Sequence, residues 1–205
     1  MLEKYLNRIP KIIGEINYSK YAVFLPIIKK KEEYHILFEV RAYHMRRQPG
    51  EVCFPGGRVD KTDRDSKMTA LRETKEELGV DSGNIEQIFP LDYVVSPFGT
   101  IIYPYAGIIR DEVEIIPNPE EVAETFTVPL SFFMETDPEY YKVHFHAEPE
   151  KDFPFHSIYG GEKYKWQIRH LDELFYFYES YTIWGLTANI LKNFIEIINN
   201  ESSDR

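Results

Sequence analysis

The sequence predicts an α/β fold, and three observations support this prediction. Runs of β-branched and aromatic residues alternate along the chain with segments whose apolar residues have helical spacing. The 205 residues are 43% hydrophobic and 15% aromatic, which is enough to build one packed core. No repeat, low-complexity stretch or obvious linker divides the sequence. We therefore expect a single domain over residues 1–205.

The first elements that we expect are a helix and a hairpin. Residues 1–18 mix charged and apolar side chains at helical spacing, which predicts an amphipathic helix interrupted near Pro10. Two β-rich runs follow, over residues 21–28 and 34–40, and the charged residues 29–33 between them predict the turn of a hairpin. The lysines of this turn are also compatible with a nucleic-acid patch, but two glutamates follow them at once, which favours a solvated turn.

One further helix is expected in the middle of the chain. A segment with several glycines and prolines spans residues 41–65. The helix then runs from about Ser66 to Leu78, and Gly79 marks its end because glycine readily adopts the left-handed conformation found there.

The carboxyl-terminal half predicts more strands and a last helix. Strands are expected over residues 85–95 and 101–109, a core segment over residues 128–133 and a helix over residues 184–198. Residues 140–181 are rich in tyrosine and phenylalanine. We interpret this segment as core and interface, with a lid over a bound substrate as the alternative.

Charge and cysteine content limit the functional classes. With 34 acidic and 24 basic side chains the formal net charge is −10, which argues against a general nucleic-acid or membrane-surface binder. An anionic substrate remains compatible where arginines or divalent ions reverse the local sign. The single cysteine, Cys53, excludes an internal disulfide, and we interpret it as a small apolar filler rather than a nucleophile. Without the apolar run of a signal peptide or a membrane span, a cytoplasmic protein is expected.

The predicted helix over residues 66–78 carries its acids together. Glu73, Glu76 and Glu77 lie at positions i, i+3 and i+4, away from the apolar residues of the helix. Gathered carboxylates are ligands that Mg²⁺ and Mn²⁺ prefer, and a solvated helix face is the alternative. The preceding turn, Phe54–Arg58, favours the metal site, because its two glycines let the backbone approach a ligand closely.

These residues resemble the Nudix box, which would span residues 57–80. Its second half reads Arg72-Glu73-Thr74-Lys75-Glu76-Glu77-Leu78-Gly79-Val80. Thr74 stands where the family usually has an apolar residue. In the first half Asp63 stands where the family has glutamate, and one extra residue precedes Arg72. The resemblance implies a Nudix fold, an α/β/α sandwich with a mixed β-sheet.

The same resemblance implies a role for each residue of the box. Glu73, Glu76 and Glu77, together with the carbonyl of Gly57, would bind Mg²⁺ or Mn²⁺. Arg72 would hold the loop against the helix. Such a site hydrolyses a diphosphate, because metal ions neutralise the charge that builds on the phosphate oxygens as water attacks phosphorus.

Many Nudix enzymes take one more carboxylate from a later loop. In this sequence an acidic loop follows Pro119 and contains Glu120, Glu121 and Glu124. Glu121 is the first choice, either as a metal ligand or as the base that takes the proton of the attacking water. The alternative is that these acids are solvated loop charges.

A motif upstream of the box narrows the expected substrate. The spacing of Arg41 and Arg46 before the run Phe54-Pro55-Gly56-Gly57 is similar to the signature of the coenzyme A diphosphatase branch of the family. Later matches to that branch are Ser96–Gly99, Pro117–Val122 and Trp184–Thr187. The resemblance implies that Arg41 and Arg46, with the backbone of Gly56 and Gly57, bind substrate phosphates. An ordinary surface salt bridge is the alternative for Arg41.

We therefore expect a metal-dependent enzyme that cleaves the diphosphate bond of coenzyme A or an acyl-CoA. The products would be 3′,5′-ADP and 4′-phosphopantetheine or its acyl form. Its partner would be this small molecule, with no nucleic acid and no membrane, and a homodimer remains open. Two alternatives are a Nudix diphosphatase for another nucleotide derivative, such as ADP-ribose or NADH, and a non-catalytic nucleotide sensor. The intact glutamates of the box argue against the sensor.

Overall fold

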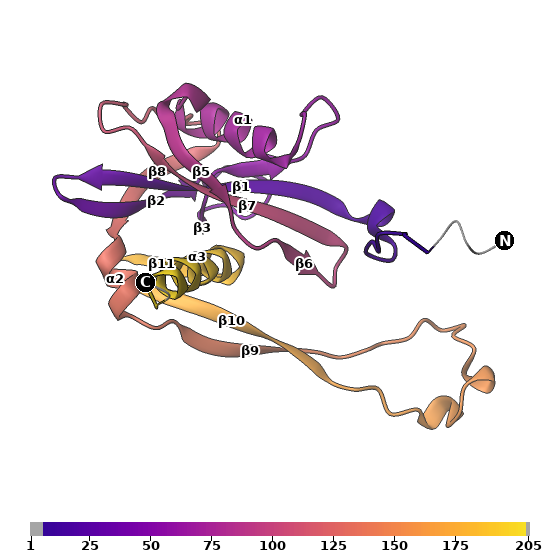
Figure 1. Ribbon diagram of the computed structural model, residues 1–205. Coiled ribbons are helices and arrows are strands. Elements are labelled where there is room, and N and C mark those ends of the chain that lie inside the picture. The colour runs from indigo at the N-terminus through magenta and orange to yellow at the C-terminus, as the bar shows by residue number, and fades with distance from the viewer. Residues whose placement is uncertain (1–5, 204–205) are drawn as a thin grey trace.

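A mixed eight-stranded β-sheet organises the computed structural model, which describes residues 6–203 (Figure 1). Its strands are β1 (Ser19–Lys30), β2 (Glu33–Arg41), β3 (Val52–Cys53), β4 (Gly56–Arg58), β5 (Ile85–Pro90), β6 (Val94–Ser96), β7 (Thr100–Ile109) and β8 (Val122–Pro129). The main order is β3-β2-β1-β7-β5, while β4 pairs with β1, β6 with β7 and β8 with β2. Among these described strands β1 and β7 are parallel, and the other pairs are antiparallel.

Helices cover both faces of this sheet. Helix α1 (Ser66–Leu78) lies on one face and helix α3 (Gly185–Ser203) on the other, and the short α2 (Leu130–Glu135) follows β8 (Figure 1). One buried apolar cluster fills the space on the α1 side and a larger one the space on the α3 side. The predicted α/β/α sandwich with a mixed sheet is therefore confirmed.

Strand β2 shows how the sequence divides between these two clusters. Ile36, Phe38 and Val40 belong to the cluster on the α3 side, and Leu37 belongs to the cluster on the α1 side. Because side chains alternate along a strand, Glu39 shares the α1 side with Leu37. A carboxylate thus takes the next position on a face that otherwise packs against the helix.

Helix α1 forms over the residues that the sequence predicts, and its ends explain why. Asp65 is in an extended conformation, and its side chain accepts a hydrogen bond from the backbone N–H of Met68 at 2.9 Å. Gly79 has φ of 71°, and its N–H donates to the carbonyl of Lys75. Both signals are local; the sequence prediction used Gly79 and did not select Asp65 as a cap.

The predicted hairpin of β1 and β2 is confirmed, while the later strands are more broken than expected. The single strand expected over residues 85–95 is divided into β5 and β6, and Gln87 within β5 has a φ of 50° beside a register shift. The core segment expected over residues 128–133 ends β8 and continues as α2. The last helix is confirmed and extends to Ser203.

The helix expected over residues 1–18 does not form in its described part. Residues 6–18 consist of turns and a short 3₁₀ helix, η2 (Glu15–Asn17), and the rest of the expected helix lies outside the described residues. Pro10 cannot donate a helical hydrogen bond, and Gly14 has φ of 79°. Ile13 is 97% exposed, so no surface covers the apolar face that would stabilise a helix here.

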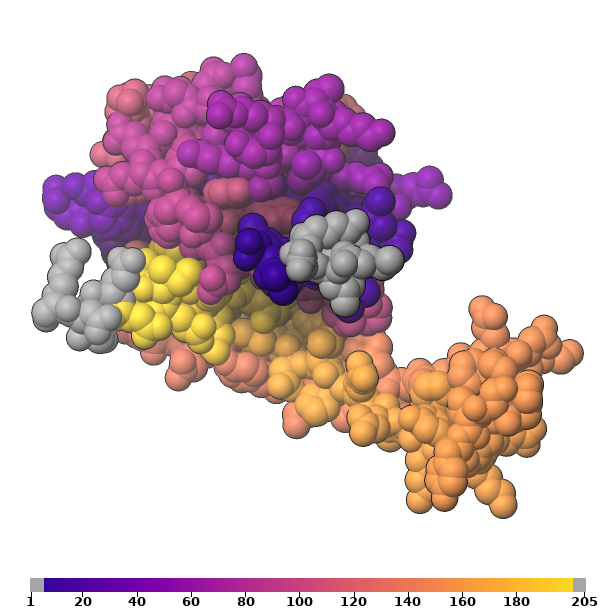
Figure 2. Space-filling model, turned by 45° about the vertical axis from the view of Figure 1, so that its right-hand side comes forward, coloured from indigo at the N-terminus to yellow at the C-terminus, as the bar shows by residue number. Residues whose placement is uncertain are grey.

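The aromatic segment forms a long hairpin that projects from the sandwich. Strands β9 (Glu139–Phe145), β10 (Arg169–Tyr178) and β11 (Tyr181–Trp184) make a second sheet in the order β11-β10-β9. The chain between β9 and β10 includes the 3₁₀ helices η4 (Phe155–Ser157) and η5 (Gly161–Lys163), and it stands apart from the body in Figures 1 and 2.

Only the base of this hairpin belongs to the core. Leu174 and Tyr176 are buried, whereas Tyr140 and Tyr141 are about half exposed and Tyr159 is fully exposed. The core part of the prediction for residues 140–181 holds only for the base of the hairpin, while the interface and the lid stay predictions. Alternation explains part of the difference, because Leu174 and Tyr176 of β10 belong to the cluster on the α3 side, whereas the intervening Phe175 packs against Trp184 and Tyr141 outside that cluster.

Two further observations complete the fold. The remaining 3₁₀ helix, η3 (Ser82–Asn84), connects α1 to β5. None of the helices in the described chain combines the length and apolar character needed to cross a membrane.

The cap of α1 leads to a stability prediction. Asp65→Ala removes the acceptor for the N–H of Met68 and is expected to lower the free energy of unfolding by about 1 kcal/mol, measured by urea denaturation. Asp111→Ala removes the same charge from an exposed turn and is the control, with an expected change below about 0.5 kcal/mol. Equal losses in both variants would contradict a capping role.

Candidate active site

The turn before α1 packs its backbone directly against the sheet and the helix. Gly56 and Gly57 lie in β4, opposite Val23 and Ala22 of β1. A Cβ on Gly56 would lie 2.6 Å from the carbonyl oxygen of Ala22, and a Cβ on Gly57 would collide with the carboxylate of Glu73. The two glycines are therefore required by close approach, as the sequence predicted for a turn beside a ligand site.

Glu77 connects α1 to this turn. Its Oε2 accepts a hydrogen bond from the backbone N–H of Gly56 at 2.8 Å, and the residue is only 3% exposed. Burial raises the pKa of Glu77, and the charge of Glu39 raises it further. The solvated helix face, the alternative reading of these acids, does not hold for Glu77, because the N–H of Gly56 gives this carboxylate a partner inside the protein.

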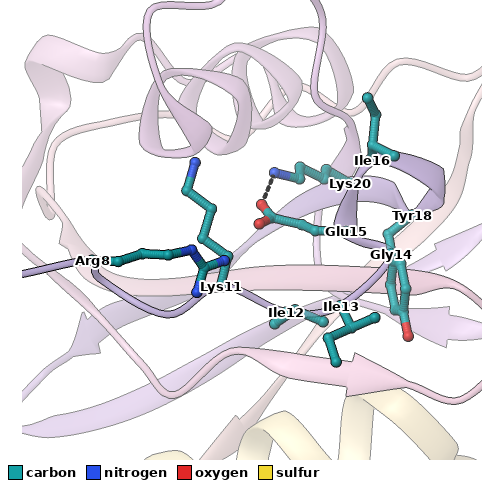
Figure 3. Close-up of a pocket in the computed structure, with 9 residues that line it drawn as sticks. All are labelled: Arg8, Lys11, Ile12, Ile13, Gly14, Glu15, Ile16, Tyr18 and Lys20. Carbon is teal, nitrogen blue, oxygen red and sulfur yellow. Dashed lines mark hydrogen bonds and ion pairs between the residues drawn. The ribbon is translucent and has the colours of Figure 1, made fainter. Parts of the chain in front are cut away.

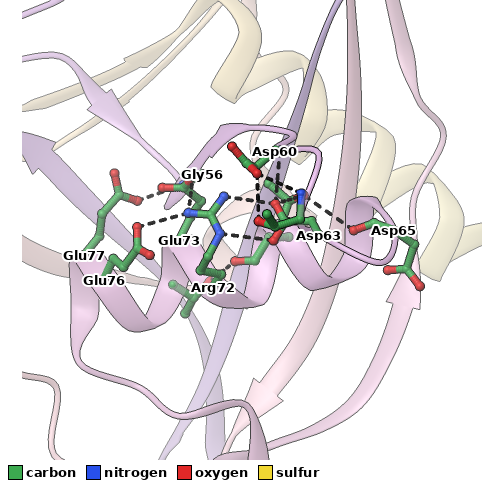
Figure 4. A network of polar contacts seen from close by, with 12 residues as sticks. Gly56, Asp60, Asp63, Asp65, Arg72, Glu73, Glu76 and Glu77 are labelled. Atoms are coloured by element: carbon green, nitrogen blue, oxygen red, sulfur yellow. Dashed lines mark hydrogen bonds and ion pairs between the residues drawn. The ribbon is translucent and has the colours of Figure 1, made fainter.

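Arg72 gathers the acids on the outer side of the helix (Figure 4). Its Nη1 lies 2.9 Å from Oε1 of Glu73 and 3.1 Å from Oε2 of Glu76. Its Nε and Nη2 donate to the two carboxylate oxygens of Asp63 at 3.2 and 3.1 Å. Asp63 is the aspartate in the first half of the box, so this geometry links the loop to the helix through one guanidinium.

The pKa values of these carboxyl groups follow from their surroundings. The bonds from Arg72 lower the pKa of Asp63 from 3.8 to about 2, and a hydrogen bond from the Thr69 hydroxyl at 2.8 Å contributes. Burial raises the pKa of Glu73, although Arg72 opposes that effect. The ionised forms of Asp63 and of the Arg72 guanidinium therefore stabilise each other, while Glu73 and Glu77 are held in surroundings that favour an added cation.

Glu39 is a buried site residue that sequence analysis did not select. It is 1% exposed, and its Oε1 accepts a hydrogen bond from the Cys53 thiol at 3.3 Å. Burial raises the pKa of both groups, that of Cys53 strongly. Cys53 thus fills space and donates to an acid, as a poor nucleophile would. The available signal was a glutamate inside the β-rich run 34–40, where an apolar residue is the norm.

The remaining predicted residues, which are Arg41, Arg46 and Glu121, lie outside α1 and the turn before it. Arg41 ends β2, and its Nε is buried without a hydrogen-bond partner among the described residues. Arg46 is exposed in the loop that follows. The charge of Glu121 acts on Glu39 as well as on Glu73 and Glu77 of α1, and its carbonyl accepts from the N–H of Ala42 at 2.8 Å. Glu121 is thus brought beside the box, while Arg46 is not fixed to it.

The donor set fits a hard divalent cation. Glu73 and Glu77 lie against the turn at Gly56 and Gly57, Glu76 lies on the same helix, and carboxylate oxygens are the ligands that such a cation prefers. Within residues 6–203 no three acidic, histidine or cysteine side chains are already arranged as a metal cluster. Arg72 explains this, since it engages Glu73 and Glu76 at ion-pair distance. These two side chains would turn from Arg72 toward an ion.

A pocket of about 300 Å³ opens beside the two glycines. Its other lining residues are Tyr21, Val23, Gln48, Thr100, Ile102 and Leu186. A larger pocket of about 660 Å³ lies on the amino-terminal residues 8–20, where Lys20 and Glu15 form an ion pair at 2.6 Å (Figure 3). Of the predicted site residues, Gly56 and Gly57 line the first pocket and none lines the second; the predicted glutamates and arginines line neither.

The Asp63–Arg72 contact leads to a pH prediction. Because the folded-state pKa of Asp63 is depressed, its stabilising effect is present above the usual value of 3.8 and is lost as pH falls toward about 2. Asp63→Asn is expected to be less stable than wild type at about pH 7, and the gap should close between about pH 4 and pH 2, as measured by urea denaturation. A gap that is constant over this range would contradict the assignment; Asp111→Asn serves as the exposed control.

Comparisons with known proteins agree with this geometry. Residues 19–146 match the NUDIX domain. A mouse protein described as peroxisomal coenzyme A diphosphatase NUDT7 is 33% identical over 145 residues, which are 71% of this chain and 61% of the mouse protein. An Enterobacter protein described as an uncharacterized Nudix hydrolase, NudL, is 31% identical over 196 residues, which cover 93% of this chain and 91% of the relative.

A solved structure supports the fold independently. A MutT/nudix family protein from Enterococcus faecalis superposes with a TM-score of 0.54 at 17% identity, covering 96% of this chain and 67% of the other. The matched domain contains all eight strands of the large sheet and all of α1. The chain therefore belongs to the Nudix family of hydrolases, whose members generally act with divalent metal ions.

Proposed function

We propose that this protein is a Mg²⁺- or Mn²⁺-dependent diphosphatase that acts on coenzyme A or acyl-CoA. The observation that carries the proposal is the position of Arg41. It ends the same strand that contains Glu39, and its buried Nε has no partner among the described residues. The site thus combines carboxylates suited to a cation with an arginine suited to a phosphate, as a diphosphate substrate with an additional phosphate requires.

The similarity to the mouse relative supports the substrate class. That protein is described as a coenzyme A diphosphatase, and the aligned region covers 71% of this chain. The segment from Arg41 to Gly57 resembles the signature of this branch. It contains Cys53, the hydrogen-bond partner of Glu39, and it ends at the pocket beside the two glycines. We therefore assign the substrate phosphates to Arg41 and Arg46 and to the backbone of Gly56 and Gly57.

The residues of the chain would divide the reaction as follows. Glu73, Glu76, Glu77 and the carbonyl of Gly57 would hold the divalent ion. When bound, such an ion neutralises phosphate charge and lowers the pKa of a nearby water. Glu121 is the candidate for accepting the proton of the attacking water. The oxygen of that water would form a bond to phosphorus while the bridging P–O bond breaks. The products would be 3′,5′-ADP and 4′-phosphopantetheine or its acyl form.

Arg72 has a positioning role in this proposal. Its bonds to Asp63, Glu73 and Glu76 keep the loop and the helix in register. A guanidinium in this place also lowers the repulsion among the three acids until a cation takes over that role.

The first functional prediction concerns the metal glutamates. Glu76→Gln keeps the size of the side chain and removes a charge, so kcat for coenzyme A hydrolysis is expected to fall at least about 100-fold. Glu112→Gln, in an exposed turn, is the control and should keep wild-type activity. A chelator should abolish wild-type activity, and added Mg²⁺ or Mn²⁺ should restore it. Unchanged turnover by Glu76→Gln would show that the box is not catalytic.

The second functional prediction concerns Arg41. Wild type is expected to prefer coenzyme A over dephospho-coenzyme A, and Arg41→Gln should raise KM for coenzyme A by about 10-fold or more through loss of a charge-assisted hydrogen bond. Arg110→Gln removes an arginine that pairs with Glu86 and serves as the control. Faster hydrolysis of ADP-ribose or NADH than of coenzyme A would leave the family assignment intact and overturn the proposed substrate.

A further inference from the structure

We propose that Glu39 is an additional carboxylate ligand of the divalent ion, reaching the site from strand β2 rather than from α1. This inference rests on the metal dependence in the proposed function, but not on the identity of the substrate. The resemblance to the family assigns the metal to the helix glutamates and to the turn, so a ligand from this strand would enlarge the site.

The position of Glu39 points it toward α1. Along β2 the residues on either side, Phe38 and Val40, pack into the cluster on the α3 side, while Leu37 packs on the α1 side. Alternation places Glu39 on the side of Leu37. It is central in its sheet, opposite Cys53 of β3 and Thr125 of β8.

The carboxylate of Glu39 has an unfilled position. Its Oε1 accepts from the Cys53 thiol at 3.3 Å, and its Oε2 has no hydrogen-bond partner among the described residues, although the residue is only 1% exposed. A carboxylate oxygen that is shielded from water and unpaired is unfavourable. A cation would remove that penalty.

The side chains of Glu39 and Glu77 both form hydrogen bonds with the short segment 53–56. Glu39 contacts Cys53, and Glu77 accepts from the N–H of Gly56, which follows Cys53 by three residues. Such a stretch spans at most roughly 10 Å. The charge of Glu39 also acts directly on Glu77. Two buried carboxylates that both carry charge repel each other, and a cation bound near them would relieve that repulsion.

Arg41 offsets the charge of Glu39 only in part: burial, the larger effect, raises the pKa of Glu39, and the guanidinium of Arg41 lowers it. No ion pair joins Arg41 to Glu39 among the described residues, and its own Nε is buried and unpaired. The two unpaired atoms, Oε2 of Glu39 and Nε of Arg41, need opposite partners, a cation for Glu39 and an anion for Arg41. A divalent ion together with a phosphate group would satisfy both at once, which is the chemistry of a metal-bound diphosphate.

The test is metal binding without substrate. Glu39→Gln keeps the size of the side chain and its ability to accept from Cys53, but it removes the charge. Mn²⁺ titration followed by electron paramagnetic resonance is expected to show a Kd about 10-fold higher than for wild type. Glu33→Gln is the matched control, because Glu33 lies at the other end of β2 and accepts from Ser131 at 2.5 Å. Its Mn²⁺ affinity should equal that of wild type.

Thermal unfolding separates metal binding from a structural role. Without metal, Glu39→Gln is expected to melt at or above the wild-type Tm, because repulsion with Glu77 is removed. Saturating Mn²⁺ should then raise the Tm of wild type more than that of the variant. A lower metal-free Tm combined with an unchanged Mn²⁺-dependent rise would assign Glu39 to structure alone and overturn the proposal.

A second variant keeps the test decisive if the glutamine variant does not fold. Glu39→Asp retains the charge but is one methylene shorter, so it should also bind Mn²⁺ more weakly than wild type. Wild-type Mn²⁺ affinity in either folded variant would overturn the proposal. These titrations contain no nucleotide, so a failure of coenzyme A hydrolysis would count against the proposed substrate without affecting the result for Glu39.

Discussion

The contact between the turn at Gly56–Gly57 and the carboxylates of α1 is the constraint on which the site depends. Gly57 lies so close to Glu73 that no Cβ fits between them, and the N–H of Gly56 donates to Glu77 at 2.8 Å. At this point the helix is positioned by contacts with the backbone of the turn rather than by the packing of apolar side chains. Since β4 pairs with β1, the same contact ties the acids to the centre of the sheet.

The charges around this contact are balanced by the placement of one arginine and not by equal numbers of acidic and basic residues. One guanidinium, that of Arg72, lies within 3.1 Å of oxygens from Asp63, Glu73 and Glu76. The inner acids, Glu39 and Glu77, have no such partner and are buried. Of the 34 acidic residues, these two are buried where a divalent ion and a phosphate would bind.

Sequence reasoning succeeded where the signals are local. Gly79 marks the end of α1, and the pattern of the box identified its acids. It failed where a tertiary partner decides the outcome. Residues 6–18 have helical spacing but no surface to pack on, and the direction of Glu77 depends on a backbone N–H more than twenty residues away. Glu39 escaped notice because no motif contains it.

The parallel pairing of β1 with β7 has a consequence for how the protein folds. It joins Ser19 to Thr100, so Arg41, the turn at Gly56–Gly57 and the glutamates of α1 lie inside the chain that this pairing encloses. Closing so long a segment is entropically costly and slow compared with forming a helix or a hairpin. Helix α1 can acquire its shape early, whereas the carboxylates meet their turn only when distant strands have joined. The active site is therefore complete only late in folding, after the large sheet has formed.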